Sequence, residues 1–221
     1  MVKSPKITQK EAAFYTQEEV SRILKALNQE PIKYQTLFTL ALSTGLRKGE
    51  LLGLEWSHID FEEREIHVKQ TSIYRPGKEY GVYTESPKSR SSKRTLSISD
   101  LEISLLTQLF SEQERQIERL GAERKNHNRL FTQWNGKPMH PSTANSHFRK
   151  FLKKNDIPVK SFHTTRHTNI TLLLANNVDL KTVIQRAGHT DGLMTLNRYA
   201  HALKIKDREA SEKIQKLFFK P

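Results

Sequence analysis

Apolar residues recur along this chain in two different periods, and the change between them separates helical from extended stretches. After the capping-box pattern of Thr16 and Glu19, apolar positions follow at helical spacing and predict a helix that ends near Leu27. The same spacing predicts further helices over residues 30–43, 47–54, 99–120, 141–154, 163–176, 179–187, 191–201 and 207–219.

Residues at the ends of these stretches support the predicted boundaries. Pro31 and Pro141 suit a first helical turn, where an N–H group has no intrahelical partner to lose. Ser99 and Glu102 repeat the capping box. Gly45 ends the second helix, because glycine tolerates backbone angles that other residues resist.

One stretch between the third and fourth predicted helices favours strands instead. Alternating and β-branched residues give strand candidates over 66–74, 82–84 and 95–98, with a turn at 75–78. We expect one three-stranded antiparallel sheet, with a basic loop over 88–94 between its last two strands. The predicted fold class is therefore α+β, mostly helical with one small three-stranded antiparallel sheet.

Composition narrows the classes of partner. The 221 residues suffice for one substantial core, and no Pro/Gly/Ser-rich linker divides them. The 37 Lys and Arg exceed the 24 Asp and Glu, and a net charge of +13 favours nucleic acid over membrane. Cysteine is absent, so the chain has no disulfide framework and no thiolate metal site, which fits a reducing cytosol. No apolar run approaches the length of a membrane span, and the N-terminus lacks a secretory apolar region.

Two histidines and an arginine fall within one turn of the predicted helix at 163–176. His163 and Arg166 are three residues apart and share a face, where an imidazole and a planar guanidinium can grip one phosphate. A packed histidine beside a surface arginine would show the same spacing. His163 and His167 also have zinc-helix spacing, but Thr164 stands where the general-base glutamate of that motif belongs.

Arg47 follows the glycine break and begins a predicted helix, with Glu50 one turn on. Backbone N–H groups at a helix start attract anions, so Arg47 could bind an anion there while Glu50 orients its guanidinium. The alternative is an exposed ion pair that contributes only tenths of a kcal/mol.

Three further candidates lie in the basic loop and near the C-terminus. Lys88 shares its loop with several other cations, and such a tip can enter a DNA groove or remain a solvated loop. Gly188 and His189 end one predicted helix, and Tyr199 follows ten residues later. A phenol with a pKa near 10 is a poor nucleophile unless nearby charges favour its deprotonation, and Tyr199 could equally pack at a helix edge.

Five short frames, in this order, resemble the catalytic domain of the tyrosine recombinases, the phage-integrase family. Each of these motifs alone is weak evidence for a family. Few other protein families require two arginines, two histidines, a lysine and a late tyrosine in this order. The resemblance covers residues 14–205, after a basic lead-in over 1–13 and before a tail helix over 206–221. The frames are Thr44-Gly45-Leu46-Arg47-Lys48-Gly49-Glu50-Leu51, Ser86-Pro87-Lys88-Ser89, His163-Thr164-Thr165-Arg166-His167, Ala187-Gly188-His189 and Asn197-Arg198-Tyr199-Ala200-His201.

The resemblance implies an enzyme that cleaves and rejoins DNA through a 3′-phosphotyrosine formed by Tyr199. Arg47 and Arg166 would hold the oxygens of the scissile phosphate, as expected where charge develops in phosphoryl transfer. His163 would assist proton transfer, and His189 would steady the phosphate.

The resemblance also implies that Lys88 is the general acid, although Lys93 lies close by in sequence. No cofactor and no metal ion is expected, because the arginines take the charge-neutralising role that metals serve elsewhere. The implied partner is double-stranded DNA, bound by a homotetramer that assembles from free monomers in the nucleoid-associated cytoplasm. The tail helix would dock its apolar stripe on a neighbouring protomer.

Two packing positions depart from the family pattern, since Thr165 and Ala187 replace leucines. An upstream core-binding domain, usual in the family, is not found before residue 16, so we expect a fragment or a shortened relative. Three alternatives remain open: a type IB topoisomerase, a non-catalytic DNA-binding module, and a zinc hydrolase built on His163 and His167.

Overall fold

The protein is a helix-rich α+β domain in a computed structural model that describes residues 13–76, 82–85, 93–124, 128–189 and 211–218. Residues 211–218 are helical, and the predicted helix over 191–201 lies outside the described residues. No helix within these ranges is long and apolar enough to cross a membrane. The named helices are α1 (Gln17–Leu27), α2 (Ile32–Thr44), α3 (Lys48–Leu52), α4 (Asp100–Leu120), α5 (Pro141–Lys154), α6 (Thr164–Ala175) and α7 (Leu180–Ala187), with short 3-10 turns at η1 (Trp56–His58) and η3 (Gly121–Glu123).

Local capping explains where several of these helices begin. The Thr16 hydroxyl accepts a hydrogen bond from the Glu19 N–H at 3.2 Å, and the Glu19 carboxylate accepts one from the Thr16 N–H at 2.9 Å. Pro141 occupies the first turn of α5 as predicted. Pro31 does not belong to the first turn of α2: its extended backbone makes it the N-cap, and the helix begins one residue later.

Within the residues that the structure describes, the strands form two small sheets, where the sequence predicts one. β1 (Ile59–Asp60), β2 (Glu65–Val68) and β5 (Arg94–Ser97) make a three-stranded antiparallel sheet in the order β1-β2-β5. β3 (Thr71–Tyr74) and β4 (Val82–Glu85) pair with each other and form a separate two-stranded sheet in the described part of the chain. The small antiparallel sheet is therefore confirmed, but its predicted membership is wrong.

Close packing of β3 on α3 explains the separate hairpin. A Cβ atom added at Gly49 would lie 2.5 Å from the Thr71 hydroxyl, and one at Gly53 would lie 3.1 Å from the Ser72 nitrogen. The Gln70 amide also donates to the Gly53 carbonyl at 2.8 Å. These contacts hold β3 on the glycine face of α3 and away from the strand pair β2–β5.

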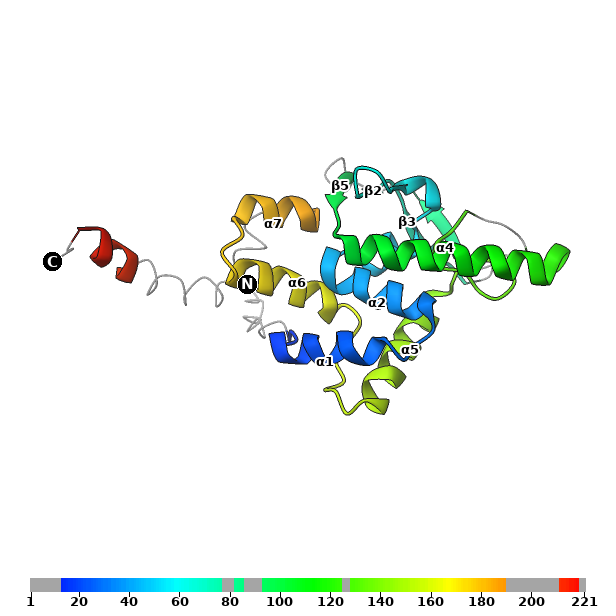
Figure 1. Cartoon of the computed structure of the whole chain (residues 1–221), viewed down its shortest axis with the longest axis horizontal. Coiled ribbons are helices and arrows are strands. Elements are labelled where there is room, and N and C mark those ends of the chain that lie inside the picture. The colour runs from blue at the N-terminus through cyan, green and yellow to red at the C-terminus, as the bar shows by residue number, and fades with distance from the viewer. Residues whose placement is uncertain (1–12, 77–81, 86–92, 125–127, 190–210, 219–221) are drawn as a thin grey trace, which may run out of the picture.

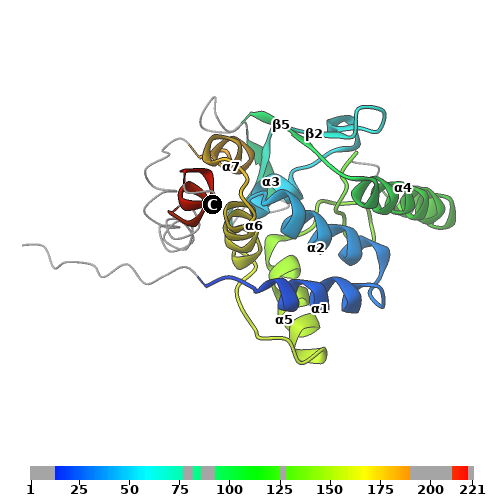
Figure 2. The ribbon, with the colours of Figure 1, turned by 60° about the vertical axis from the view of Figure 1, so that its left-hand side comes forward.

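One large apolar core joins α1, α2, α4 and α5, with α6 and α7 at one end of the molecule (Figure 1). Phe38 of α2 lies at its centre and contacts the rings of Phe148, Phe151 and Phe162. The free end of α4 points away from α6 and α7 in both views (Figures 1 and 2). A second, smaller cluster joins α6 to α7 through Ile170, Leu174, Val183 and Ala187.

Candidate active site

The C-terminal ends of α2 and α7 meet at one buried arginine. Both helices end in a left-handed glycine, Gly45 with φ 63° and Gly188 with φ 62°. Arg166 of α6 is 3% exposed and donates to the Gly45 carbonyl at 2.8 Å and to the Ala187 carbonyl at 2.7 Å. Helix C-termini carry partial negative charge and unpaired carbonyls, so they hold a guanidinium favourably.

Arg47 reaches the same place from the other side of Gly45. It is the N-cap of α3, and its guanidinium donates to the Glu50 carboxylate at 2.8 Å and to the Gly188 carbonyl at 2.9 Å. Its side chain is 40% exposed, in contrast to buried Arg166. The two arginines therefore donate to neighbouring carbonyls, and the structure brings together residues that lie 119 positions apart (166 − 47).

Glu50 organises the arginines around it as a buried carboxylate. Burial alone would raise the pKa of Glu50, but the hydrogen bonds and charge of Arg94, followed by those of Arg47, outweigh burial and lower the pKa. Glu50 is therefore ionised around neutral pH. Arg94 donates to both of its oxygens, at 3.2 and 3.0 Å.

His163 stands at the edge of a basic groove of about 560 Å³. It is the exposed N-cap of α6, and its ring lies edge-to-face with His167 at a centroid distance of 4.7 Å. Lys48, next to Arg47 in sequence, lines this groove and donates to Asn145 at 3.3 Å. Burial lowers the pKa of Lys48. The other charged residues of the groove are Arg149 and Lys160.

A zinc site at His163 and His167 gains no support from the surrounding side chains. Among the residues that the structure describes, no group of three or more histidines, cysteines or carboxylates is placed to hold a metal ion.

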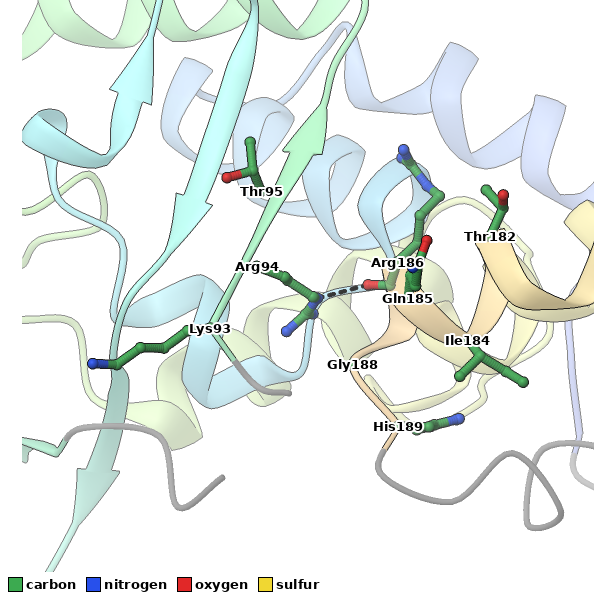
Figure 3. Close-up of a pocket in the computed structure, with 9 residues that line it drawn as sticks. All are labelled: Lys93, Arg94, Thr95, Thr182, Ile184, Gln185, Arg186, Gly188 and His189. Carbon is green, nitrogen blue, oxygen red and sulfur yellow. Dashed lines mark hydrogen bonds between the residues drawn. The ribbon is translucent and has the colours of Figure 1, made fainter. Parts of the chain in front are cut away.

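His189 lies on the chain that leaves α7, across from the start of β5 (Figure 3). Lys93 and Arg94 line the same cavity of about 430 Å³. A dashed line in Figure 3 joins the Arg94 guanidinium to the Arg186 carbonyl, at 2.8 Å. Lys88 and Tyr199 lie outside the described residues. Lys93, the other candidate general acid, lines this cavity.

The two departures from the family pattern are accommodated locally. Thr165 is buried and its hydroxyl donates to the Phe162 carbonyl at 2.8 Å, so the added polar group is paired. Ala187 is buried in the small α6–α7 cluster, and its contribution to the arginine site is its backbone carbonyl.

Sequence reasoning missed the structural importance of Arg94, which it placed in the basic loop over residues 88–94. The side chain is only 8% exposed and pairs with Glu50, itself 5% exposed. One local signal was present: Arg94 lies two residues before buried Leu96, so strand alternation places both on the same face. Its partners lie 44 and 92 positions away along the chain and leave no local pattern.

Comparisons with known proteins agree with this architecture. Residues 13–205 match the phage integrase family, and the chain belongs to that family. It is 33% identical over 213 residues to a tyrosine recombinase XerC-like protein of Caldanaerobacter subterraneus subsp. tengcongensis, covering 92% of this chain and 54% of that protein. It is 29% identical over 216 residues to the ICEBs1 integrase of Bacillus subtilis, covering 98% and 58%.

Solved structures show the same fold. The Tn1549 transposon integrase in complex with circular intermediate DNA is 25% identical with a TM-score of 0.78, covering 94% of this chain and 68% of that chain. XerA recombinase is 22% identical with a TM-score of 0.69, covering 91% and 66%. The chain spans a little over half the length of the curated relatives it matches.

Proposed function

We propose that this chain is the catalytic domain of a site-specific DNA recombinase that cleaves and rejoins strands through a 3′-phosphotyrosine. The observation that carries the proposal is the meeting of Arg47 and Arg166 at the end of α7, in a chain of the phage integrase family. Arginine forks match phosphate oxygens bidentately, and two of them can neutralise a phosphate without a metal ion.

The proposed reaction uses six residues. The Tyr199 oxygen attacks the scissile phosphorus, the bond to the 5′ oxygen breaks, and the tyrosine remains joined to the 3′ phosphate. His163 assists the departure of the phenol proton, and Lys88 gives a proton to the leaving 5′ oxygen. Rejoining is the reverse attack by a 5′ hydroxyl. The remaining residues, which hold the phosphate as charge develops, are Arg47, Arg166 and His189.

The proposed substrate is double-stranded DNA. Three features support it: the net charge of +13, the groove beside His163 with its three cations, and a relative of similar fold solved with circular intermediate DNA. A DNA backbone laid along this groove would contact Lys160, Arg149 and His163, which all line it.

A nicked duplex tests the proposal, because loss of the short fragment after cleavage traps the covalent adduct. The chain should give a denaturant-stable protein–DNA adduct on duplexes that carry candidate attachment sites. Tyr199→Phe should abolish the adduct and leave DNA affinity nearly unchanged, since one hydroxyl contributes little to binding a polyanion. Tyr74→Phe, an exposed tyrosine outside the proposed site, is the matched control.

An adduct that persists in Tyr199→Phe would assign the nucleophile to another tyrosine. DNA binding without any adduct would favour a non-catalytic DNA-binding module. Relaxation of supercoiled DNA without strand exchange would favour topoisomerase chemistry.

We further propose that residues 14–205 act as the catalytic domain and that 206–221 form a tail that links protomers of a tetramer on DNA. Ile214, Leu217 and Phe218 support this, because they are 50, 72 and 72% exposed and need a surface to cover them. Deletion of residues 206–221 should leave thermal melting unchanged and abolish assembly on DNA. A deletion that unfolds the domain would make the tail part of its own core.

A further inference from the structure

Three arginines from three separate segments donate to three successive carbonyls at the end of α7. Arg94 at the start of β5 bonds to the carbonyl of residue 186, Arg166 of α6 to that of 187, and Arg47 to that of 188. The last carbonyls of a helix have no intrahelical partners, so each guanidinium satisfies one of them. The exit of α7 is thereby fixed at three consecutive residues.

Arg94 differs from the other two arginines in what else it holds. Its two remaining nitrogens donate to both oxygens of Glu50, at 3.2 and 3.0 Å. Glu50 in turn accepts from the guanidinium of Arg47 at 2.8 Å and from its backbone N–H at 2.9 Å. The carboxylate thus lies between buried Arg94 and exposed Arg47, and of these two Arg47 is the one proposed to meet a phosphate.

The end of α7 also packs directly against Arg94. A Cβ atom added at Gly188 would lie 2.7 Å from a terminal nitrogen of Arg94 and 2.9 Å from its central carbon. The guanidinium therefore fills the space beside the left-handed turn that precedes His189. Figure 3 shows it lying between β5 and the last turn of α7.

We propose that Arg94 is a positioning residue for strand cleavage, which holds Glu50, and through it Arg47, while fixing the end of α7. The proposal rests on the proposed function. Because the chain continues from α7 towards Tyr199, and β5 follows the loop that carries Lys88, one buried side chain connects the segments that bear the proposed phosphate grip, nucleophile and general acid. No contact with DNA is assigned to it.

The test uses the whole chain on the nicked duplex, with cleavage rate measured in single turnover at saturating protein and Kd measured separately. Arg94→Met should slow cleavage at least about thirtyfold, because Glu50 would no longer hold the Arg47 guanidinium in position and Arg47 would lose most of its contact with the transition state. The Kd should change by less than about threefold, since the DNA-facing cations remain. Arg115→Met, which removes an exposed arginine paired with Glu112, is the matched control and should change neither.

The pH profile separates positioning from plain structural support. Without Arg94, burial raises the pKa of Glu50 unopposed by its largest partner, so the carboxylate protonates at higher pH than in the parent. Cleavage by Arg94→Met should therefore lose more of its rate than the parent does as pH is lowered, which gives the variant an additional acid limb. Adding Glu50→Gln should remove that acid limb without restoring the rate.

Four outcomes would overturn the proposal. Arg94→Met could cleave at the parental rate when the DNA is saturated with protein. The double variant with Glu50→Gln could regain the parental rate, which would mean that Arg94 only balances the buried charge of Glu50. The fold reductions in cleavage rate of Arg94→Met and Glu50→Gln could multiply in the double variant, which would show that Arg94 acts independently of Glu50. Absence of any adduct with the parent chain would remove the proposed function itself.

Arg94→Lys decides the matter if Arg94→Met fails to fold. An ammonium cannot reproduce the fork that spans Glu50 and the carbonyl of residue 186, so cleavage should still fall at least about tenfold at unchanged Kd. Parental cleavage by Arg94→Lys would overturn the proposal.

Discussion

Helices α2 and α7 are held in the domain by opposite means. Eight of the thirteen residues of α2 are buried, and Phe38 packs against the rings of three other phenylalanines. α7 buries only Val183 and Ala187 in a small cluster, and three guanidinium groups hold its last carbonyls. Apolar packing is strong but non-directional, whereas hydrogen bonds fix distance and angle. The comparison assigns stability to the first region and the geometry of the proposed site to the second.

The largest expected effect belongs to the aromatic core. Phe38→Ala should lower the free energy of unfolding by about 3–5 kcal/mol, because it removes a fully buried ring and leaves a cavity. Denaturant unfolding measures this free energy. The control is Leu101→Ala at an exposed position, which should change the free energy of unfolding by less than about 0.5 kcal/mol. A small loss at Phe38 would break the comparison, since α2 would then not depend on its ring contacts.

The next effect separates the two arginines of the proposed phosphate grip. Arg47→Ala and Arg166→Ala should each slow cleavage at least about a hundredfold, and lysine at either position should not restore it fully. Arg166→Ala should lower stability more than Arg47→Ala does, by about 1–3 kcal/mol, because it leaves the buried carbonyls of Gly45 and Ala187 unpaired.

Single-turnover cleavage and thermal melting of the same two variants measure this split. Equal destabilisation by both substitutions would contradict it, since the Arg47 side chain is 40% exposed.

A smaller effect tests the packing of Arg94 on Gly188. Gly188→Ala should cost about 1–2 kcal/mol for the left-handed backbone and about 1 kcal/mol more for the clash with a guanidinium held by Glu50 and the carbonyl of residue 186. The control is exposed Asn177, which also has a positive φ of 64°. The difference in stability between Asn177→Gly and Asn177→Ala gives the backbone cost alone.

Thermal unfolding should show the extra cost at residue 188 in the parent and not in an Arg94→Met background. An equal cost in both backgrounds would mean that the Arg94 side chain moves aside freely.

The smallest effect concerns the groove beside His163. DNA binding should weaken steeply with salt, and Arg149→Ala should reduce the slope of log Kd against log salt by about one. Arg115→Ala on α4 should leave the slope unchanged. Salt titrations by fluorescence anisotropy measure both, and an unchanged slope for Arg149→Ala would place the DNA elsewhere.

Sequence predicted those parts of the fold that local chemistry decides. The capping boxes of α1 and α4 and the first-turn proline of α5 depend on residues within three or four positions of each other, and each is confirmed. β1 was missed because two residues, Ile59 and Asp60, carry no readable alternation. The separate hairpin was missed because it depends on how closely Gly49 and Gly53 approach β3, which no period in the sequence reports.

The same division applies to the candidate site. The Arg47–Glu50 pair is a three-residue spacing and could be read directly. The sequence could not predict the hydrogen bonds to the end of α7 from Arg47, Arg94 and Arg166. These bonds span 141, 92 and 21 positions, and they end on carbonyl groups that every residue type possesses.

Backbone acceptors also determine which substitutions this region tolerates. Residues 186 and 187 present carbonyls to Arg94 and Arg166 whatever side chain they bear, so either position can change identity without losing the bond. Gly188 is constrained on both counts, by its φ of 62° and by the guanidinium beside it. Hydrogen bonding therefore restricts the side chain at Gly188 and at the three donor arginines, whereas residue 187 is restricted only by its packing in the α6–α7 cluster. The replacement of the family's leucine by Ala187 keeps the carbonyl that Arg166 binds.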